Sequence, residues 1–158
     1  MGRVVSLAVS RKKGTPKTPV DQVVLVPDHG IEGDAHAGPW HRQVSLLRVE
    51  ALAAAQQRGI LADFGDFAEN LAVSGLDEKG LAVGTLLDVG PTARLCVTQV
   101  GKKCHARCAV YHRAGDCIMP KEGVFARVLS GGTVKVGDVV RIVARGQGPP
   151  GGGNAAAV

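Results

Sequence analysis

Aromatic residues are scarce in this sequence: one tryptophan, one tyrosine and three phenylalanines make up 3% of its 158 residues. Hydrophobic residues together make up 45%, an ordinary content for a globular protein, so the core must be built mainly of aliphatic side chains. Proteins that bind single-stranded nucleic acids stack the bases on aromatic side chains. The shortage of aromatic residues therefore argues against a protein that binds single-stranded nucleic acid, and we do not expect nucleic acid as the partner.

Long apolar runs and internal repeats are also missing. No uninterrupted apolar run approaches the roughly 18 residues of a membrane span, and the first residues contain no apolar signal core. The length fits one domain. We therefore expect a cytoplasmic protein that does not bind a membrane, with a folded domain over residues 1–145. Residues 146–158 (GQGPPGGGNAAAV) contain few large apolar groups, and we expect a flexible tail.

Negative charge is in deficit, with a net charge of +5 and an isoelectric point near 9.3. A basic balance favours an anionic partner. Four cations fall in residues 10–19, which also contain two prolines and a glycine and are expected to form a loop. Two interpretations of this loop remain open: a solvated surface segment or an arm that binds an anion.

Short β-strands separated by glycine turns are the dominant pattern. The strands are expected over residues 3–9, 20–26, 85–89, 94–100, 124–129, 134–136 and 139–143. Strands of this length and frequency indicate a closed or nearly closed barrel, within a mainly β (α+β) fold that has few helices. One helix is expected over residues 46–58, capped by Ser45 and ended by Gly59. A second short helix is expected near Asp63 or Asp66.

Residues 28–42 are too irregular for a helix or a strand. Three glycines are interleaved with aspartate and histidine in this segment, so we expect a shaped loop of the kind that often carries function. His29, His36, His41 and Arg42 surround the only tryptophan, and we interpret this group as the wall of a site. For His36 alone, a structural hydrogen-bonding role is the alternative. Asn70 has two similar interpretations, as a turn or cap residue and as a polar group in a pocket.

The segment 101–115 (GKKCHARCAVYHRAG) contains two cysteines, two histidines and four basic residues. Lys102, Lys103 and Arg107 favour the thiolate form of Cys104 or Cys108. A thiolate is a nucleophile and a ligand for polarisable metals. The segment lacks the paired CxxC spacing of most structural zinc sites, and no nucleophile elbow indicates a hydrolase. Cys96, which lies within an expected strand, is interpreted as a buried, inert thiol.

Several ordered blocks of this sequence resemble the MOSC domain, the module similar to the C-terminal part of molybdenum-cofactor sulfurases. The resemblance extends over residues 4–143. The blocks are Lys13-Gly14 with Lys17, residues 30–38 (GIEGDAHAG), 41–46 (HRQVSL), 65–71 (GDFAENL), 101–104 (GKKC) with Cys108, 123–129 (GVFARVL) and Gly137-Asp138.

The resemblance implies a barrel-like fold that handles a molybdenum or tungsten pterin cofactor. It implies that a cysteine carries persulfide sulfur or ligates the metal, with Cys108 as the first choice and Cys104 as the second. The phosphate of the cofactor calls for cations, and the pterin calls for hydrogen-bonding groups. The residues assigned to the cofactor site are Lys17, Arg42 and Arg127 for the phosphate, His36, Ser45 and Asn70 for the pterin, and Lys103 and Arg107 beside the cysteines.

The expected function is binding of the molybdenum-molybdopterin cofactor with transfer of cysteine-borne sulfur during cofactor maturation. The sequence contains no desulfurase domain like that of the full-length sulfurases, so a cysteine desulfurase is the expected sulfur donor and a molybdoenzyme the expected acceptor. Two alternatives remain. One is a non-catalytic carrier in which the cysteine only ligates the metal, and the other is a small structural zinc protein that contacts nucleic acid through its basic, anion-binding loops.

Overall fold

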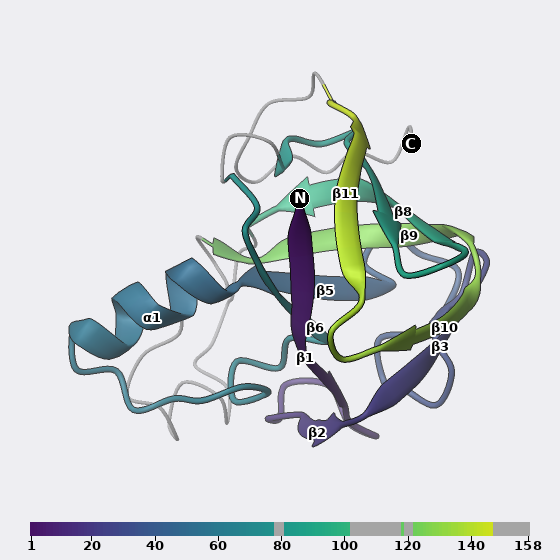
Figure 1. Ribbon diagram of the computed structural model, residues 1–158. Helices are drawn as coiled ribbons and strands as arrows, with labels where there is room; N and C mark the ends of the chain where they lie inside the picture. Colours follow the sequence, from purple (N-terminus) through teal and green to yellow (C-terminus); the bar gives the residue numbers. More distant parts are fainter. Residues whose placement is uncertain (78–80, 102–117, 119–121, 147–158) are drawn as a thin grey trace.

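A closed seven-stranded barrel forms the centre of the molecule (Figure 1). The computed structural model describes residues 1–77, 81–101, 118 and 122–146. The strand order around the barrel is β11-β7-β8-β9-β5-β6-β1, and pairing of β11 with β1 closes it. The strands are β1 (Gly2–Val9), β5 (Val44–Arg48), β6 (Leu71–Ser74), β7 (Leu86–Val89), β8 (Ala93–Val100), β9 (Val124–Ser130) and β11 (Val139–Ala144). The expected barrel-like, mainly β fold is confirmed.

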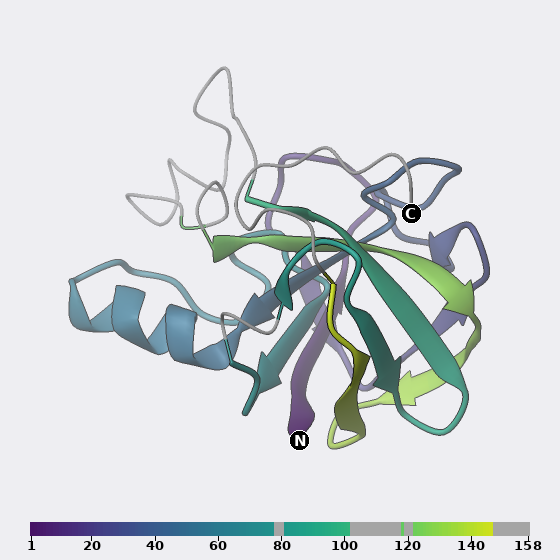
Figure 2. The same ribbon diagram turned by 90° about the horizontal axis from the view of Figure 1, so that it is seen from above.

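A smaller sheet lies against the barrel. It has the order β10-β3-β4 and consists of β10 (Gly132–Lys135), β3 (Gln22–Val26) and β4 (Gly30–Ile31). The short strand β2 (Thr18–Val20) pairs with the end of β1. Burial alternates along β3, where Val23 and Leu25 point into the core. Figure 2 shows how β10 and β3 lie beside the barrel strands.

The main core of the barrel is aliphatic, as the scarcity of aromatic residues predicts. Its buried members are all valine, leucine, isoleucine or alanine, and Leu7, Leu87 and Leu95 are completely buried. The described phenylalanines that are fully buried, Phe67 and Phe125, belong to a second cluster with Leu47. This second cluster packs beneath the helix rather than inside the barrel.

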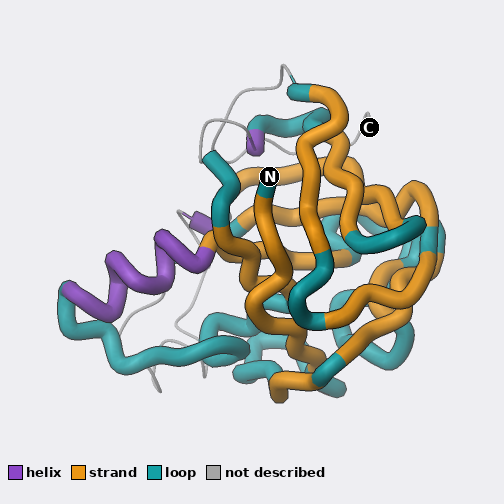
Figure 3. The backbone as a smooth tube through the Cα atoms, in the orientation of Figure 1, coloured by secondary structure: helices purple, strands orange, loops and turns teal. Residues whose placement is uncertain are grey.

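The described helix α1 (Val49–Gln57) is shorter than the sequence suggests, and it projects from one side of the barrel (Figure 3). Residues 46–48 belong to β5 and not to the helix, so the prediction that Ser45 caps the helix is wrong. The strand forms because both edges of β5 pair, one with β6 and one with β9. Its first four residues are all buried, so both of its faces are covered. A strand buried on both faces has a continuous apolar sequence, which does not differ locally from that of a buried helix.

The second short helix is also absent: residues 64–67 form turns. The side chain of Glu69 accepts hydrogen bonds from the backbone of Gly65 and Phe67, 2.8 and 3.2 Å long, and these contacts stabilise the turns instead. The expected hairpin at Gly90 is confirmed, since Val89 of β7 pairs with Ala93 of β8. Within the described part of the chain, no helix is long and apolar enough to cross a bilayer.

Candidate functional site

A buried ion pair joins the basic loop after β1 to the glycine-rich loop after β4. Lys17 Nζ lies 2.8 Å from Asp34 Oδ1, and it is also 3.0 Å from both Ser10 Oγ and His36 Nδ1. The other oxygen of Asp34 accepts the backbone N–H of His36 at 3.0 Å. The two loops are therefore fixed relative to each other by one aspartate and one lysine.

This ion pair also sets the chemistry of His36. Burial by itself would raise the pKa of Asp34, but the Lys17 ammonium and the backbone amides of Ser10 and His36 outweigh burial and lower that pKa. Because a lysine ammonium can only donate, His36 Nδ1 accepts the hydrogen bond. A neutral His36 then carries its proton on Nε2.

Trp40 lies at the centre of the loop that His36 begins. Its Nε1 donates a 2.7 Å hydrogen bond to the His36 carbonyl, which fixes the indole ring. The ring of His36 is parallel to it with the centroids 6.3 Å apart, and the ring of His41 meets it edge-on at 5.8 Å. Two cations lie over the indole: Lys13 Nζ at 4.4 Å and the Arg42 guanidinium carbon at 4.6 Å from the centroid. The structure thus gathers His36, His41 and Arg42 around Trp40.

Arg42 is held by two aromatic rings, and no described carboxylate pairs with it. Its guanidinium carbon lies 5.7 Å from the centroid of Phe125, in addition to its contact with Trp40. The Nε atom of Arg42 is buried and has no hydrogen-bond partner among the described residues. Arg42 is therefore a positioned cation whose buried Nε–H has no described acceptor.

The same loop contacts the beginning of the cysteine segment. His41 Nε2 lies 2.8 Å from Gln99 Oε1, and Gln99 Nε2 donates to the carbonyl of Gly101 at 2.7 Å. The backbone N–H of Gly101 in turn binds the carbonyl of Gly123 at 2.7 Å, so the segment leaves β8 and returns to β9 at neighbouring points. Four sequence-predicted site residues, Lys103, Cys104, Arg107 and Cys108, lie outside the described residues.

Arg127 belongs to a second polar cluster, at the turn between β3 and β4. It forms a close ion pair with Asp28, which also accepts a 3.1 Å hydrogen bond from Gln43. The hydrogen bond from Arg127, followed by that from Gln43, lowers the pKa of Asp28. His29, in the same turn, is exposed. Arg127 therefore has a structural partner, and its role in binding phosphate stays a prediction.

Ser45 and Asn70 bind each other in the interior. Asn70 Oδ1 accepts the backbone N–H and the hydroxyl of Ser45 at 2.9 and 3.1 Å, and its Nδ2 donates to the carbonyl of Ala8 at 3.1 Å. Both residues are buried. The pair connects β5, β6 and β1, and the assignment of the two side chains to pterin binding stays a prediction.

Comparison with known proteins identifies the family. The family model of the MOSC domain matches residues 33–141, which is more than half of the chain. The chain belongs to the MOSC domain family. This confirms the resemblance that the sequence blocks indicate, and the matched range includes the Trp40 loop, the cysteine segment and most of the barrel.

Solved structures agree with the MOSC fold. YiiM from Geobacillus stearothermophilus has a TM-score of 0.71 at 24% identity, over 96% of this chain and 80% of that one. YuaD from Bacillus subtilis has a TM-score of 0.73 at 21% identity, and the match covers 89% of this chain and 94% of YuaD. YiiM from Escherichia coli has a TM-score of 0.61 at 21% identity, and the match covers 91% of this chain and 71% of that protein. A comparison with curated proteins found no match.

Asp34 and Gln99 of this MOSC domain site escaped sequence reasoning, and Lys13, one of the four cations of the basic loop, was not assigned to the cofactor. Asp34 lies in a block that carried the family resemblance, and its position two residues before His36 was the signal that could have indicated an orienting role. Gln99 had no such signal, because in an alternating strand it reads as an ordinary polar position. Among the described residues, no group of three or more histidines, cysteines and acids is placed to hold a metal.

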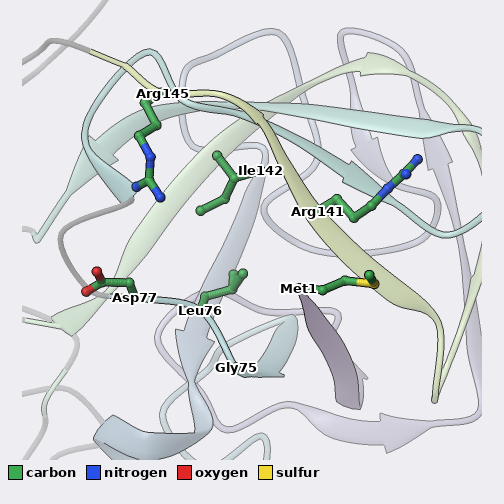
Figure 4. Close-up of a pocket in the computed structure, with 7 residues that line it drawn as sticks. All are labelled: Met1, Gly75, Leu76, Asp77, Arg141, Ile142 and Arg145. Atoms are coloured by element: carbon green, nitrogen blue, oxygen red, sulfur yellow. The ribbon is translucent and has the colours of Figure 1, made fainter.

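A cavity of about 410 Å³ lies at the N-terminal end of β1, away from the loop that contains Lys17 (Figure 4). Leu76 and Ile142 line it together with Asp77 and Arg145. Met1 is at its edge, whereas the Lys17 loop begins after Val9 at the opposite end of the strand. Eight residues of extended chain, roughly 25 Å, therefore separate this cavity of the MOSC domain from the loop that contains Lys17.

Proposed function

We propose that this MOSC domain binds a molybdenum or tungsten pterin cofactor and carries sulfur on Cys108 or Cys104 while the cofactor matures. One observation supports this most strongly: the contact from His41 through Gln99 to Gly101. It brings the aromatic and cationic loop to the point where the cysteine segment begins. Family membership adds support, since the MOSC domain is linked to this cofactor and its sulfur.

The residues at this end of the barrel fit the chemistry of the cofactor. A phosphate needs cations with available donors, and Arg42 offers a buried Nε without a described partner. The pterin needs hydrogen-bonding groups, and His36 is held in the tautomer that donates from Nε2. The metal needs soft ligands, which thiolates provide. When bound, the cofactor supplies a dithiolene-ligated metal that can take up sulfur.

Lys17 and Asp34 have a positioning role in this proposal. Lys17 Nζ is already 2.8 Å from Asp34 and is buried, so its charge is largely balanced within the protein. What the pair contributes is a fixed orientation of His36 and of the backbone that leads to Trp40. Arg127 Nε is also buried without a described hydrogen-bond partner, but the Arg127 guanidinium already pairs with Asp28. This ion pair makes Arg127 a less suitable phosphate ligand than Arg42.

The sulfur step requires no oxidant or reductant. The cysteine thiolate attacks the outer sulfur of a persulfide on the donor protein. A new S–S bond forms on this chain as the donor's S–S bond breaks, and the electron pair leaves with the donor thiolate. Lysine and arginine around the cysteines, present in the sequence at Lys102, Lys103 and Arg107, favour the attacking thiolate.

Single replacements of the two cysteines test the proposal. Cys108→Ser and Cys104→Ser proteins would be assayed for cofactor capture, by the fluorescence of the released pterin, and for uptake of labelled sulfur from a persulfide donor. We expect normal capture, with sulfur uptake lost in at least one variant. Cys96→Ala is the matched control, because Cys96 is buried in β8 and should not affect uptake.

The other outcomes discriminate between the alternatives. If capture is lost along with sulfur uptake, the cysteine ligates the metal and the protein is a carrier. If the wild-type protein captures no pterin and is purified with stoichiometric zinc, the proposal is wrong and the zinc alternative stands.

A further inference from the structure

We propose that Lys13 and Arg42, held on Trp40, form a binding site for a tetrahedral oxyanion: inorganic phosphate or the phosphomonoester end of a larger ligand. The inference rests on the proposed function for the identity of the natural ligand. It adds Lys13 and Trp40 to the site and assigns the phosphate to this pair of cations instead of to Lys17 and Arg127.

The first observation is that two cations share one aromatic ring. Lys13 Nζ and the Arg42 guanidinium carbon both lie within 4.6 Å of the indole centroid of Trp40. At most twice that distance separates the two charges, which repel each other. A tetrahedral oxyanion accepts charge-assisted hydrogen bonds at about 2.8 Å on several sides, so an anion that contacts both cations would offset their repulsion.

The second observation is the unsatisfied donor of Arg42. Its Nε–H is buried and has no acceptor among the described residues. A buried donor without an acceptor is destabilising, and an arginine binds oxyanions through the edge that contains Nε. An oxyanion at this edge would satisfy the donor, which a weakly hydrogen-bonding anion such as chloride would do less well.

The third observation is that the Trp40 ring is held in place and that Lys17 is already paired with Asp34. Trp40 Nε1 is bonded to the His36 carbonyl at 2.7 Å, and His36 is fixed by Lys17 and Asp34. Lys17 is paired with Asp34 inside the protein, so among the described residues the cations that lie over Trp40 and can meet an incoming anion are Lys13 and Arg42. Lys13 is exposed and can move onto the anion at little cost.

Trp40 provides the readout, because it is the only tryptophan of the chain. Its fluorescence would be titrated with inorganic phosphate at constant ionic strength, with chloride as the compensating anion. We expect a saturable change for the wild-type protein. Lys13→Ala and Arg42→Gln should each weaken phosphate binding by about tenfold or more, the loss expected for a charge-assisted contact.

Lys12→Ala is the matched control. Lys12 lies in the same loop and carries the same charge, but its described contacts are through its carbonyl, which accepts from Ser10 Oγ and Thr15 Oγ1. The substitution should leave phosphate affinity within about twofold, because only a general field effect is lost. If Lys12→Ala weakens binding as much as Lys13→Ala, or if no saturable change occurs, the inference is wrong. Lys13 is exposed, so its replacement remains informative even if Arg42→Gln does not fold.

Capture of the pterin cofactor separates this inference from the proposed function. If phosphate binds as expected but no pterin is captured, the oxyanion site stands and the proposed function is wrong. If Lys13→Ala binds phosphate and captures pterin as well as the wild type does, the proposed function stands and the oxyanion site is wrong. Comparing the phosphorylated pterin with its dephosphorylated form distinguishes a phosphomonoester ligand, which only the former provides, from free phosphate.

Discussion

Lys17 Nζ and Asp34 Oδ1 are 2.8 Å apart with both side chains fully buried. Removing one partner of a buried ion pair is strongly destabilising, because the other partner is left as a buried charge without compensation. This pair also joins the two loops that carry Lys13 and Trp40. The stability of the fold and the arrangement of the candidate site therefore depend on the same contact.

Replacing Asp34 by alanine should destabilise the protein strongly. The substitution leaves the Lys17 ammonium buried without its carboxylate, and the expected loss is about 3–5 kcal/mol in the free energy of unfolding. Urea unfolding would measure it. Asp88→Ala is the control, since Asp88 pairs with Arg94 at 2.6 Å but both side chains are partly exposed. That loss should be about 1 kcal/mol or less, and equal losses in the two variants would contradict the interpretation.

Glu69 should make the protein less stable as the pH rises through neutrality. Burial, as the largest cause, raises the pKa of this carboxyl from 4.5 to about 7, although hydrogen bonds from Gly65 and Phe67 oppose the shift. Between these two values the folded state binds more protons than the unfolded state, so the free energy of unfolding falls with increasing pH. The total fall is expected to be about 3 kcal/mol, and it should level off above the folded pKa.

Urea unfolding of the wild type and of Glu69→Gln from pH 5 to pH 8 would test this. The glutamine variant cannot ionise, so this part of its pH dependence should vanish. A wild-type protein whose stability is constant or rises over this range, or a variant with an unchanged slope, would show that Glu69 does not titrate there.

Removing the side chain of Asn70 should cost more than removing the hydroxyl of Ser45. Asn70→Ala leaves the backbone N–H of Ser45 and the carbonyl of Ala8 without the side-chain partners they have in the fold. Buried groups left in this way cost about 1–3 kcal/mol each, whereas Ser45→Ala keeps both of these contacts. Thermal unfolding of the two variants would rank them, and a larger effect at Ser45 would contradict the assignment of Asn70 as the central member of the pair.

Cys96 should be the slowest of the four cysteines to react with an alkylating reagent. Burial raises the pKa of its thiol, and only 2% of the residue is exposed. Mass spectrometry of peptides after brief iodoacetamide treatment at pH 8 should find Cys96 unmodified in the folded protein and modified after unfolding in urea. Rapid labelling of Cys96 in the native state would exclude the inert structural role.

Gly65→Ala should disrupt the turn that contacts Lys17. Gly65 has a φ of 85°, and a Cβ atom there would lie 2.2 Å from the Lys17 carbonyl oxygen. Gly59 has a similar φ of 91° but open space around its Cβ position, so Gly59→Ala isolates the backbone strain of about 1 kcal/mol. Calorimetry should show a clearly larger loss for Gly65→Ala. Equal losses would mean that the close approach to Lys17 adds nothing.

The β-rich pattern was predictable because it is local. The hairpin at Gly90 and its two strands follow from alternating side chains and turn residues. Both patterns can be recognised within a few consecutive residues. The boundary between β5 and α1 was not predictable in the same way. Leu46 and Leu47 suit a buried helix as well as a buried strand, and the decision came from β6 and β9, which are distant in sequence.

The candidate site was likewise predictable only in part. The blocks of sequence indicated the family, and the interleaved histidines indicated a loop around Trp40. Which cation remains available to a ligand could not be read from the sequence: Lys13, Lys17 and Arg42 have the same formal charge. Only the fold pairs Lys17 with Asp34 and leaves the Arg42 Nε without a described acceptor.

The sequence by itself determined an aliphatic, mainly β domain of the MOSC family, because composition, strand periodicity and motif order are properties of the chain. Tertiary structure alone decided that β11 closes against β1, that Ser45 lies in a strand bound to Asn70, and that His41 reaches the start of the cysteine segment through Gln99. The physical reason is that each of these contacts joins residues far apart in the chain, and its free energy exists only when burial brings them together.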